Sequence, residues 1–439
     1  MSRHPHNTAS ETPRAPSLQR NIAYAISARV FMALSQFAIL AIIVHMGLPQ
    51  DVGALTLASA IVTPLFFLTS MGMNEVHTVD DFDRFTRADY VALRFFAGIV
   101  AIGLTILVVV FFQGDESRLV QLTAIAFSLV RFFGAQSSLI HGVFQRDERL
   151  NFVAVSTIGR GSIGLVVFAT TFWLSRNLPL ALLCEAVAWF FSYFVVDRAL
   201  LVRMNAQTQF AQLRQVRART ILALAWWVLP IGVALWMTRA SASVPPMVLA
   251  RYTDLAAVGL FGTLAYVHSA LSMAVGPMGT ASAARLRKYY REGRARKFSR
   301  LTCNLALFAG LIGLCAVAFG WFLGDVALGL VFGDTYRNAE LFTIILLGTA
   351  VSIIGMQLLT AVTAAQAFNH RLLSSALGLV AAMIAALVLI PSHGVYGAGW
   401  AMVVMAVVRL IFALTAFRIV LGKIPQARGD APSHSIVGA

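Results

Sequence analysis

The stretch from Asn21 to Met46, NIAYAISARVFMALSQFAILAIIVHM, decides the fold class of this chain. A helix of 26 residues is long enough to cross a hydrocarbon core of ~30 Å at ~1.5 Å per residue. It nevertheless contains Arg29, which on an isolated membrane helix costs ~2.5 to over 10 kcal/mol. Arg29, Ala33 and Gln36 share one helical face. We therefore expect this face to turn toward the membrane surface, an acid or a water-filled cavity.

The composition of the whole chain agrees with a membrane protein. The 439 residues are 59% hydrophobic and 12% charged, with a mean hydropathy of +0.78, whereas soluble domains have about 25% charged residues. The three cysteines have no CxxC or His/Cys ligand spacing, so we expect neither a disulfide nor a metal site. The sequence predicts an all-α polytopic membrane protein.

Apolar runs separated by short polar turns predict twelve transmembrane helices. The segment 325–337 is expected to be a turn between two of them. The expected spans are 21–46, 52–76, 88–112, 119–144, 150–174, 178–202, 221–247, 255–284, 301–324, 338–367, 371–391 and 395–421.

The distribution of basic residues predicts the orientation. With both termini in the cytoplasm, 24 of the 34 Lys and Arg residues fall in cytoplasmic connections or at the cytoplasmic ends of spans, four fall outside, and the remaining six lie deeper within spans. Such an excess in cytoplasmic connections follows the positive-inside rule. The basic loop 285–300, RLRKYYREGRARKFSR, is then expected to bind anionic lipid headgroups, although a topology signal alone also explains it. Nucleic acid is not an expected partner.

The chain has no room for a soluble catalytic domain. No connection exceeds about twenty residues, and no GxxxxGK[ST] phosphate loop occurs. We therefore expect no ATP hydrolysis, no cofactor and no enzymatic activity.

An internal similarity suggests two halves. Val52–Gly72 and Val258–Gly279 share their opening residues and a Met/Gly close, and six spans separate them. An even offset gives parallel repeats, although two apolar helices also match by chance. The expected organisation is a disordered tail, a six-helix bundle, a cytoplasmic linker, a second bundle and a tail, with limits 1–20, 21–202, 203–220, 221–421 and 422–439.

Several features of the second half carry a family resemblance. Gly259 begins a helix that contains Tyr266 and Pro277, Gly333-Asp334 precedes a long helix, and LIPSHGVYGAGWA at 389–401 makes a tight turn into the last span. With twelve spans and no large loop, the chain resembles the polysaccharide (oligosaccharidyl-lipid) flippases of the multidrug/oligosaccharidyl-lipid/polysaccharide (MOP) exporter superfamily.

This resemblance implies a V-shaped pair of bundles in the bacterial inner membrane that works by alternating access. It implies that the cargo is an undecaprenyl-diphosphate-linked oligosaccharide, such as an O-antigen, capsule or exopolysaccharide repeat unit. A coupling ion, H⁺ or Na⁺, remains open.

Six arginines lie within the expected spans, and four of them are in the first bundle: Arg29, Arg94, Arg131 and Arg160. The acids nearby are too few to neutralise them all, and surplus guanidinium groups suit a diphosphate. Structural salt bridges are the competing explanation, and Arg29 and Arg94 are near enough to the cytoplasmic ends to snorkel. The residues expected to line the cavity and bind the diphosphate are Arg29, Gln36, Arg94, Arg131, Ser138, His141 and Arg160.

Three other functions compete with a flippase for lipid-linked oligosaccharides. Cation-coupled multidrug exporters of the same superfamily generally place an acid in the first-bundle cavity, whereas the span 21–46 has Arg29 and no Asp or Glu. Membrane glycosyltransferases and polymerases usually expose a large charged external loop, which this chain lacks. The lipid II flippase branch typically adds two helices that this length does not accommodate.

Overall fold

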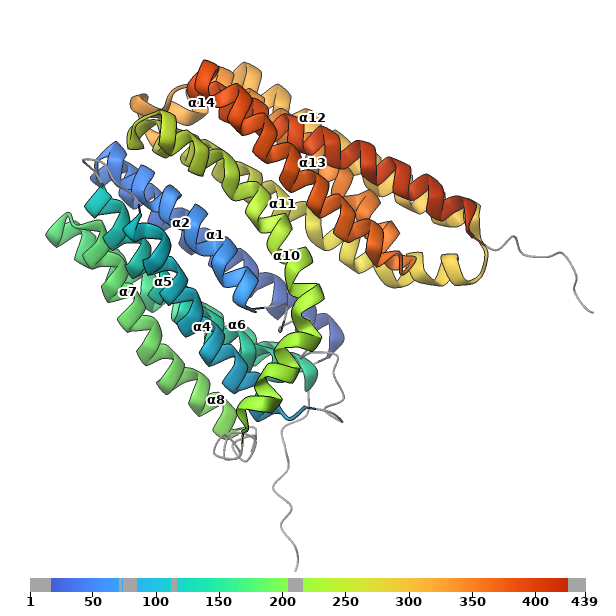
Figure 1. The fold of residues 1–439 in the computed structure, drawn as a ribbon, viewed down its shortest axis with the longest axis horizontal. Coiled ribbons are helices and arrows are strands. Elements are labelled where there is room, and N and C mark those ends of the chain that lie inside the picture. The colour runs from blue at the N-terminus through green and yellow to red at the C-terminus, as the bar shows by residue number, and fades with distance from the viewer. Residues whose placement is uncertain (1–16, 71–72, 74–84, 112–116, 204–215, 425–439) are drawn as a thin grey trace, which may run out of the picture. The chain divides into compact units, whose positions relative to one another are not determined.

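The chain is helical throughout its regular structure (Figure 1). The computed structural model describes residues 17–70, 73, 85–111, 117–203 and 216–424, and these contain no strand. Most of three expected segments therefore lies outside the described residues: the tails 1–20 and 422–439 and the linker 203–220.

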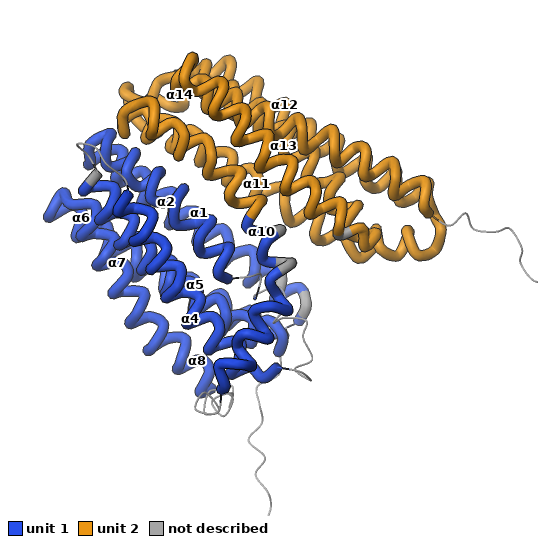
Figure 2. Tube along the Cα trace, viewed as in Figure 1, with its two compact units in different colours: residues 1–236 blue, residues 237–439 orange. Residues whose placement is uncertain are grey.

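The chain divides into two compact units, Met1–Trp236 and Met237–Ala439, which Figure 2 colours separately. The division falls inside helix α10 (Ala218–Tyr252), whereas the sequence placed the joint at 203–220. The reason is apolar packing. Leu224 and Val228 of α10 belong to the same buried cluster as Tyr90 and Leu139, so the first half of α10 is part of unit 1.

Unit 1 is a bundle in which α5 and α6 are the central helices. α5 packs against α2, α4 and α7, and α6 packs against α1 and α7. The described helices of this unit, besides the first half of α10, are α1 (Leu18–Met46), α2 (Pro49–Ser70), α4 (Arg87–Val110), α5 (Ser117–Arg146), α6 (Leu150–Ser175), α7 (Leu178–Ser192), the π-helix η1 (Tyr193–Asp197) and α8 (Arg198–Arg203).

Glycines bring the helices of unit 1 close together where the arginines lie. A Cβ on Gly98 of α4 would come within 2.5 Å of the Phe132 ring on α5. On α5, a Cβ at Gly134 would meet the Trp189 ring of α7 at 2.7 Å. Small residues permit such close approach in membrane bundles, so the positions of these glycines determine how near the polar side chains of neighbouring helices can come.

Unit 2 is organised around α13 (Ala339–Ala364). This helix packs against α11 (Leu255–Arg291), α12 (Ala295–Phe332) and α14 (Phe368–Gly422), and most of its residues are buried. Its N-terminus is capped twice, because Asn338 Oδ1 accepts from Leu341 N at 2.9 Å and Asp325 Oδ1 accepts from Ala339 N at 3.0 Å. Each cap satisfies a backbone donor that the helix leaves open.

Each of the twelve expected spans falls largely on described helices, and the final residues of the spans 52–76 and 88–112 lie outside the described residues. Ten described helices have the length and composition to cross a membrane. One of them, α14, holds both expected spans 371–391 and 395–421, joined at Gly394, whose backbone is non-helical (φ 54°, ψ −126°). The expected span 221–247 lies in α10. The all-α membrane fold is confirmed.

Two expected connections are wrong. The segment 325–337 is not a turn throughout, because α12 continues to Phe332 and only a short 3₁₀ helix, η3 (Asp334–Tyr336), separates it from α13. The segment 285–300 is not a loop either, because α11 extends to Arg291 and α12 begins at Ala295. In both places the helices continue several residues beyond the apolar run, through basic, acidic or small residues, before a short turn interrupts them.

Candidate functional site

Arg160 of α6 lies inside unit 1. Its side chain is buried, with 7% of the residue exposed, and its guanidinium carbon is 4.5 Å from the centre of the Trp189 ring on α7. Such a cation–π contact stabilises a desolvated guanidinium by about 2 kcal/mol. Among the described residues, Nε and Nη1 of Arg160 have no hydrogen-bond partner. The guanidinium is therefore held by stacking and charge more than by hydrogen bonds.

Two buried carboxylates attract this guanidinium. Glu185 of α7 and Asp197 of η1 are 4% and 1% exposed, and both act electrostatically on Arg160. Glu185 and Trp189 are four residues apart, so they share the face of α7 that meets α6. The cluster, which we call the Arg160 cluster, contains Arg160, Glu185, Trp189 and Asp197.

A chain of hydrogen bonds joins α5 to this cluster. Ser156 Oγ of α6 donates to Asp197 Oδ1, and His141 Nε2 of α5 is 2.7 Å from Ser156 Oγ. Because the hydroxyl proton of Ser156 is used by Asp197, the geometry is satisfied when His141 Nε2 is the donor. His141 thus binds a protein group and is buried.

Two local features of the fold occur at this cluster. A Cβ on Gly164 would overlap Trp189 Nε1, so glycine at this position allows the indole to lie against α6. The π-helix that ends at Asp197 interrupts the regular α-helical turns of the span, and such turns are frequent at functional sites.

A second arginine joins α4 to α5. Arg94 is 6% exposed; its Nε donates to Ala135 O at 3.2 Å, and its Nη2 donates to Ser138 Oγ at 3.3 Å. Arg131 is half-buried and lies on the same face of α5 as Ala135 and Ser138, at helical spacing. Arg94 therefore fixes the Arg131 face of α5 from the neighbouring helix.

The face of α1 that the sequence singled out is exposed in unit 1. Arg29 and Gln36 are both exposed, whereas Ala28 and Ser35 are buried. Ser35 lies on the side of α1 that meets Gly161 of α6. The cationic stripe of this first helix thus faces away from its packing partner.

Two hollows lie among the described residues of unit 1, one beside Arg94 and one between α6 and α7. A crevice of about 10 Å³ beside Arg94, between α2, α4 and α5, has space for a single water. A groove of about 590 Å³ between α6 and α7 is lined by apolar side chains, with Ile163, Val187 and Phe191 among them.

The structure thus separates the predicted binding residues into three groups. The first group is Arg160, in the buried Arg160 cluster, with His141 beside it. The second group lies at the contact of α4 with α5 and contains Arg94, Arg131 and Ser138. The third group, Arg29 and Gln36, is exposed on α1. Sequence reasoning missed Trp189. Its spacing of four residues from Glu185 was the available signal.

Comparison with known proteins gives one relative along nearly the whole chain. No protein-family model matches the chain. A capsular polysaccharide biosynthesis protein, CapF of Staphylococcus aureus, is 26% identical over 399 residues, which cover 89% of this chain and 97% of that protein.

Solved structures show the same fold. The inward-facing form of a multidrug resistance transporter of the MATE family, in the MOP superfamily, has a TM-score of 0.70 and 13% identity over 93% of this chain and 99% of that one. The lipid II flippase MurJ has a TM-score of 0.67 and 10% identity over 92% of this chain and 90% of that one. The chain is therefore a multi-pass membrane protein with the fold of the MOP superfamily, as the sequence resemblance implied.

Proposed function

We propose that this protein moves a lipid-linked oligosaccharide, carried on undecaprenyl diphosphate, across the bacterial inner membrane by alternating access, with both termini in the cytoplasm. The observation that carries the proposal is the similarity, over nearly its full length, to a capsular polysaccharide biosynthesis protein. The fold shared with a lipid II flippase supports it. No bond is made or broken in this activity, so the residues bind and release the cargo without catalysing a reaction.

The diphosphate contacts follow from burial. Arg29 is exposed, and it has no hydrogen bond or ion pair with the described residues. Arg131 is half-buried on a face that Arg94 and Ser138 hold in place. We assign the diphosphate to Arg29 and Arg131, with Gln36 and Ser138 as polar neighbours, because guanidinium groups bind phosphate oxygens in pairs.

Arg160 has a different role in this proposal. Its guanidinium is enclosed by α6 and α7 and attracted by Glu185 and Asp197. A bulky diphosphate reaches it only if these helices separate. Arg160 and His141 therefore support the positions of α5, α6 and α7, and Arg94 positions Ser138.

The competing cargo is a cationic drug, since a multidrug resistance transporter shares this fold. The charge on α1 disfavours it. The helix Leu18–Met46 contains no Asp or Glu, and it exposes Arg29. An exposed guanidinium repels a cationic ligand.

The test is a deletion strain of a glycan-producing host that carries variants of the gene. Loss of the gene is expected to trap the lipid-linked repeat unit in the inner leaflet and to abolish surface glycan. Arg131→Glu is expected to abolish rescue at a normal membrane level, whereas Arg131→Lys retains part of it. Normal glycan with lost resistance to toxic cations would overturn the proposal in favour of drug export.

A further inference from the structure

The turn between α11 and α12 carries an unusual concentration of cations. Eight basic residues, all exposed, lie on the last turns of α11 and the first turns of α12, and Glu292 is the single acid among them. We call these eight the basic hairpin: Arg285, Arg287, Lys288, Arg291, Arg294, Arg296, Lys297 and Arg300.

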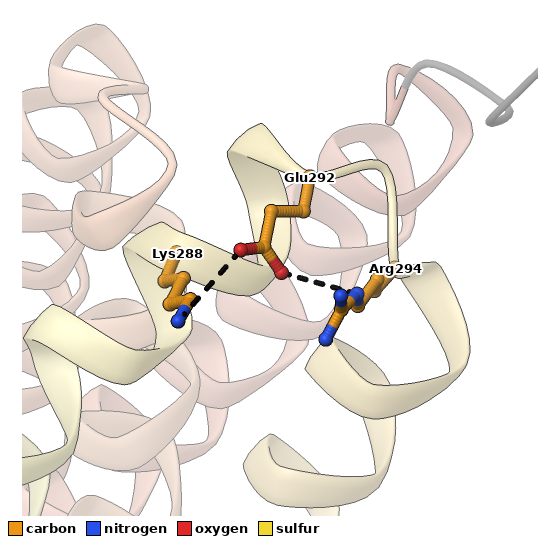
Figure 3. Close-up of polar contacts among 3 residues, drawn as sticks. All are labelled: Lys288, Glu292 and Arg294. Atoms are coloured by element: carbon orange, nitrogen blue, oxygen red, sulfur yellow. Dashed lines mark ion pairs between the residues drawn. The ribbon is translucent and has the colours of Figure 1, made fainter.

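Glu292 neutralises only two of these cations. Its Oε2 is 3.1 Å from Arg294 Nε, and its Oε1 is 3.9 Å from Lys288 Nζ (Figure 3). The carboxylate thereby joins the end of α11 to the residue before α12. Within the part of the chain that the structure describes, the other six form no ion pair.

The basic hairpin is held rigidly on unit 2. Leu286 and Phe298 are fully buried, and the Phe298 ring stacks on Phe417 of α14 with 6.0 Å between ring centres. The same apolar cluster includes Val420 near the end of α14. Since Arg418 and Lys423 are exposed at that end, α14 adds its cations to the same end of the unit.

The opposite end of unit 2 has the opposite balance. The other described acids of this unit, Asp254, Asp325, Asp334 and Glu340, all lie where α11 begins or where α12 passes to α13. One of the basic residues there, Arg337, is paired with Asp334 at 2.8 Å. The charge of unit 2 is therefore polarised along its helices.

The lipid-facing part of α12 places the hairpin relative to a bilayer. Large apolar side chains are exposed from Leu307 to Leu323, before the exposed Asp325. At ~1.5 Å per residue this is ~24 Å, most of a hydrocarbon core of ~30 Å. Arg300 lies about two helical turns before Leu307, ~10 Å along the axis. The nearest cations are thus at the depth of the lipid phosphates.

We propose that the basic hairpin is a binding surface for the phosphate headgroups of anionic bilayer lipids. Exposed cations at the end of a lipid-facing helix attract such headgroups and hold them against the guanidinium groups. The proposal goes beyond the proposed function, because the site is independent of the transported cargo. A mere topology signal acts only during insertion and leaves no lipid preference in the finished protein.

The test measures lipid retained by the purified full-length protein. The protein is equilibrated in micelles with equal amounts of phosphatidylglycerol and phosphatidylcholine, and bound lipid is counted by native mass spectrometry. We expect phosphatidylglycerol to be enriched. The double variant Arg296→Gln/Arg300→Gln is expected to retain at least about fivefold less phosphatidylglycerol. Loss of one cation near the lipid surface is enough for about a fivefold decrease.

The matched control removes two exposed cations elsewhere, with Arg118→Gln and Arg251→Gln, and is expected to change nothing. Glu292→Gln is expected to raise phosphatidylglycerol retention, because it releases Lys288 and Arg294, and it removes no cation on which folding depends. Equal retention of the two lipids by the unaltered protein would overturn the proposal. So would an equal loss in the two double variants, or no gain from Glu292→Gln.

Discussion

The guanidinium of Arg160 lies over the indole of Trp189, 4.5 Å from the ring centre, on the buried side of both helices. Glu185 is one helical turn before Trp189 on the same face of α7. A charge that the sequence offered as a phosphate contact is thus surrounded by aromatic and acidic groups of its own unit. This arrangement leads to the first prediction.

Arg160→Leu is expected to destabilise the protein by about 3 kcal/mol, because it removes the buried cation that acts electrostatically on Asp197 and Glu185 and that stacks on Trp189. The measurement is the midpoint of thermal unfolding in detergent, followed by circular dichroism. Arg118→Leu, at an exposed site, is the control and is expected to leave the midpoint unchanged. A second substitution, Glu185→Leu, is expected to restore part of the loss. An unaltered midpoint in Arg160→Leu would contradict this account.

Gly164→Ala is expected to cost about 1–3 kcal/mol, since a new Cβ would overlap Trp189 Nε1 and lie 3.1 Å from its Cδ1. Gly159→Ala on the same helix is the matched control, because a Cβ there meets nothing within 4 Å. The intrinsic fluorescence of the protein and its unfolding midpoint are measured for both variants. Equal midpoints for the two variants would contradict a close contact between Gly164 and Trp189.

Gly394→Ala is expected to destabilise by about 1–3 kcal/mol, because its φ of 54° and ψ of −126° are strained for residues with a Cβ. The two halves of α14 depend on this bend. Gly103→Ala on α4, in open surroundings, is the control and is expected to cause no loss. Thermal unfolding of both variants decides the matter; equal midpoints would count against a strained bend.

Arg29→Gln is expected to reduce export of the lipid-linked glycan while leaving stability unchanged, because the side chain is exposed and has no partner among the described residues. Arg29→Lys keeps the charge and is expected to retain more activity. Surface glycan is measured in the deletion strain, with membrane level as the control. Full export by Arg29→Gln at a normal level would remove Arg29 from the diphosphate site.

The helices were the most predictable part of the structure. Each apolar run is long enough to cross a bilayer, and every backbone group in such a run must be bonded within its helix, so length and composition suffice to locate the spans. The ends were less predictable. α11 continues through charged residues as far as Arg291, and α12 already begins at Ala295 among charged residues. A helix that leaves the membrane loses no backbone hydrogen bonds when its side chains become polar.

The candidate site was predictable in its residue types but not in its partners. The sequence indicated that Arg94, Arg131 and Arg160 needed something other than lipid, because the cost of burying a charge in hydrocarbon is independent of the fold. It did not indicate that Arg94 bonds Ala135 O and Ser138 Oγ, or that Arg160 stacks on Trp189. These partners come from other helices.

The stretch Asn21–Met46 by itself determined that this is a membrane protein and that its first helix carries a cationic stripe, since hydropathy and helical periodicity are local properties. Only the tertiary structure decided which arginines are enclosed. It buried Arg160, because α6 meets α7 at Gly164 and Trp189, and it left Arg29 exposed on α1. No local pattern encodes a contact between two helices.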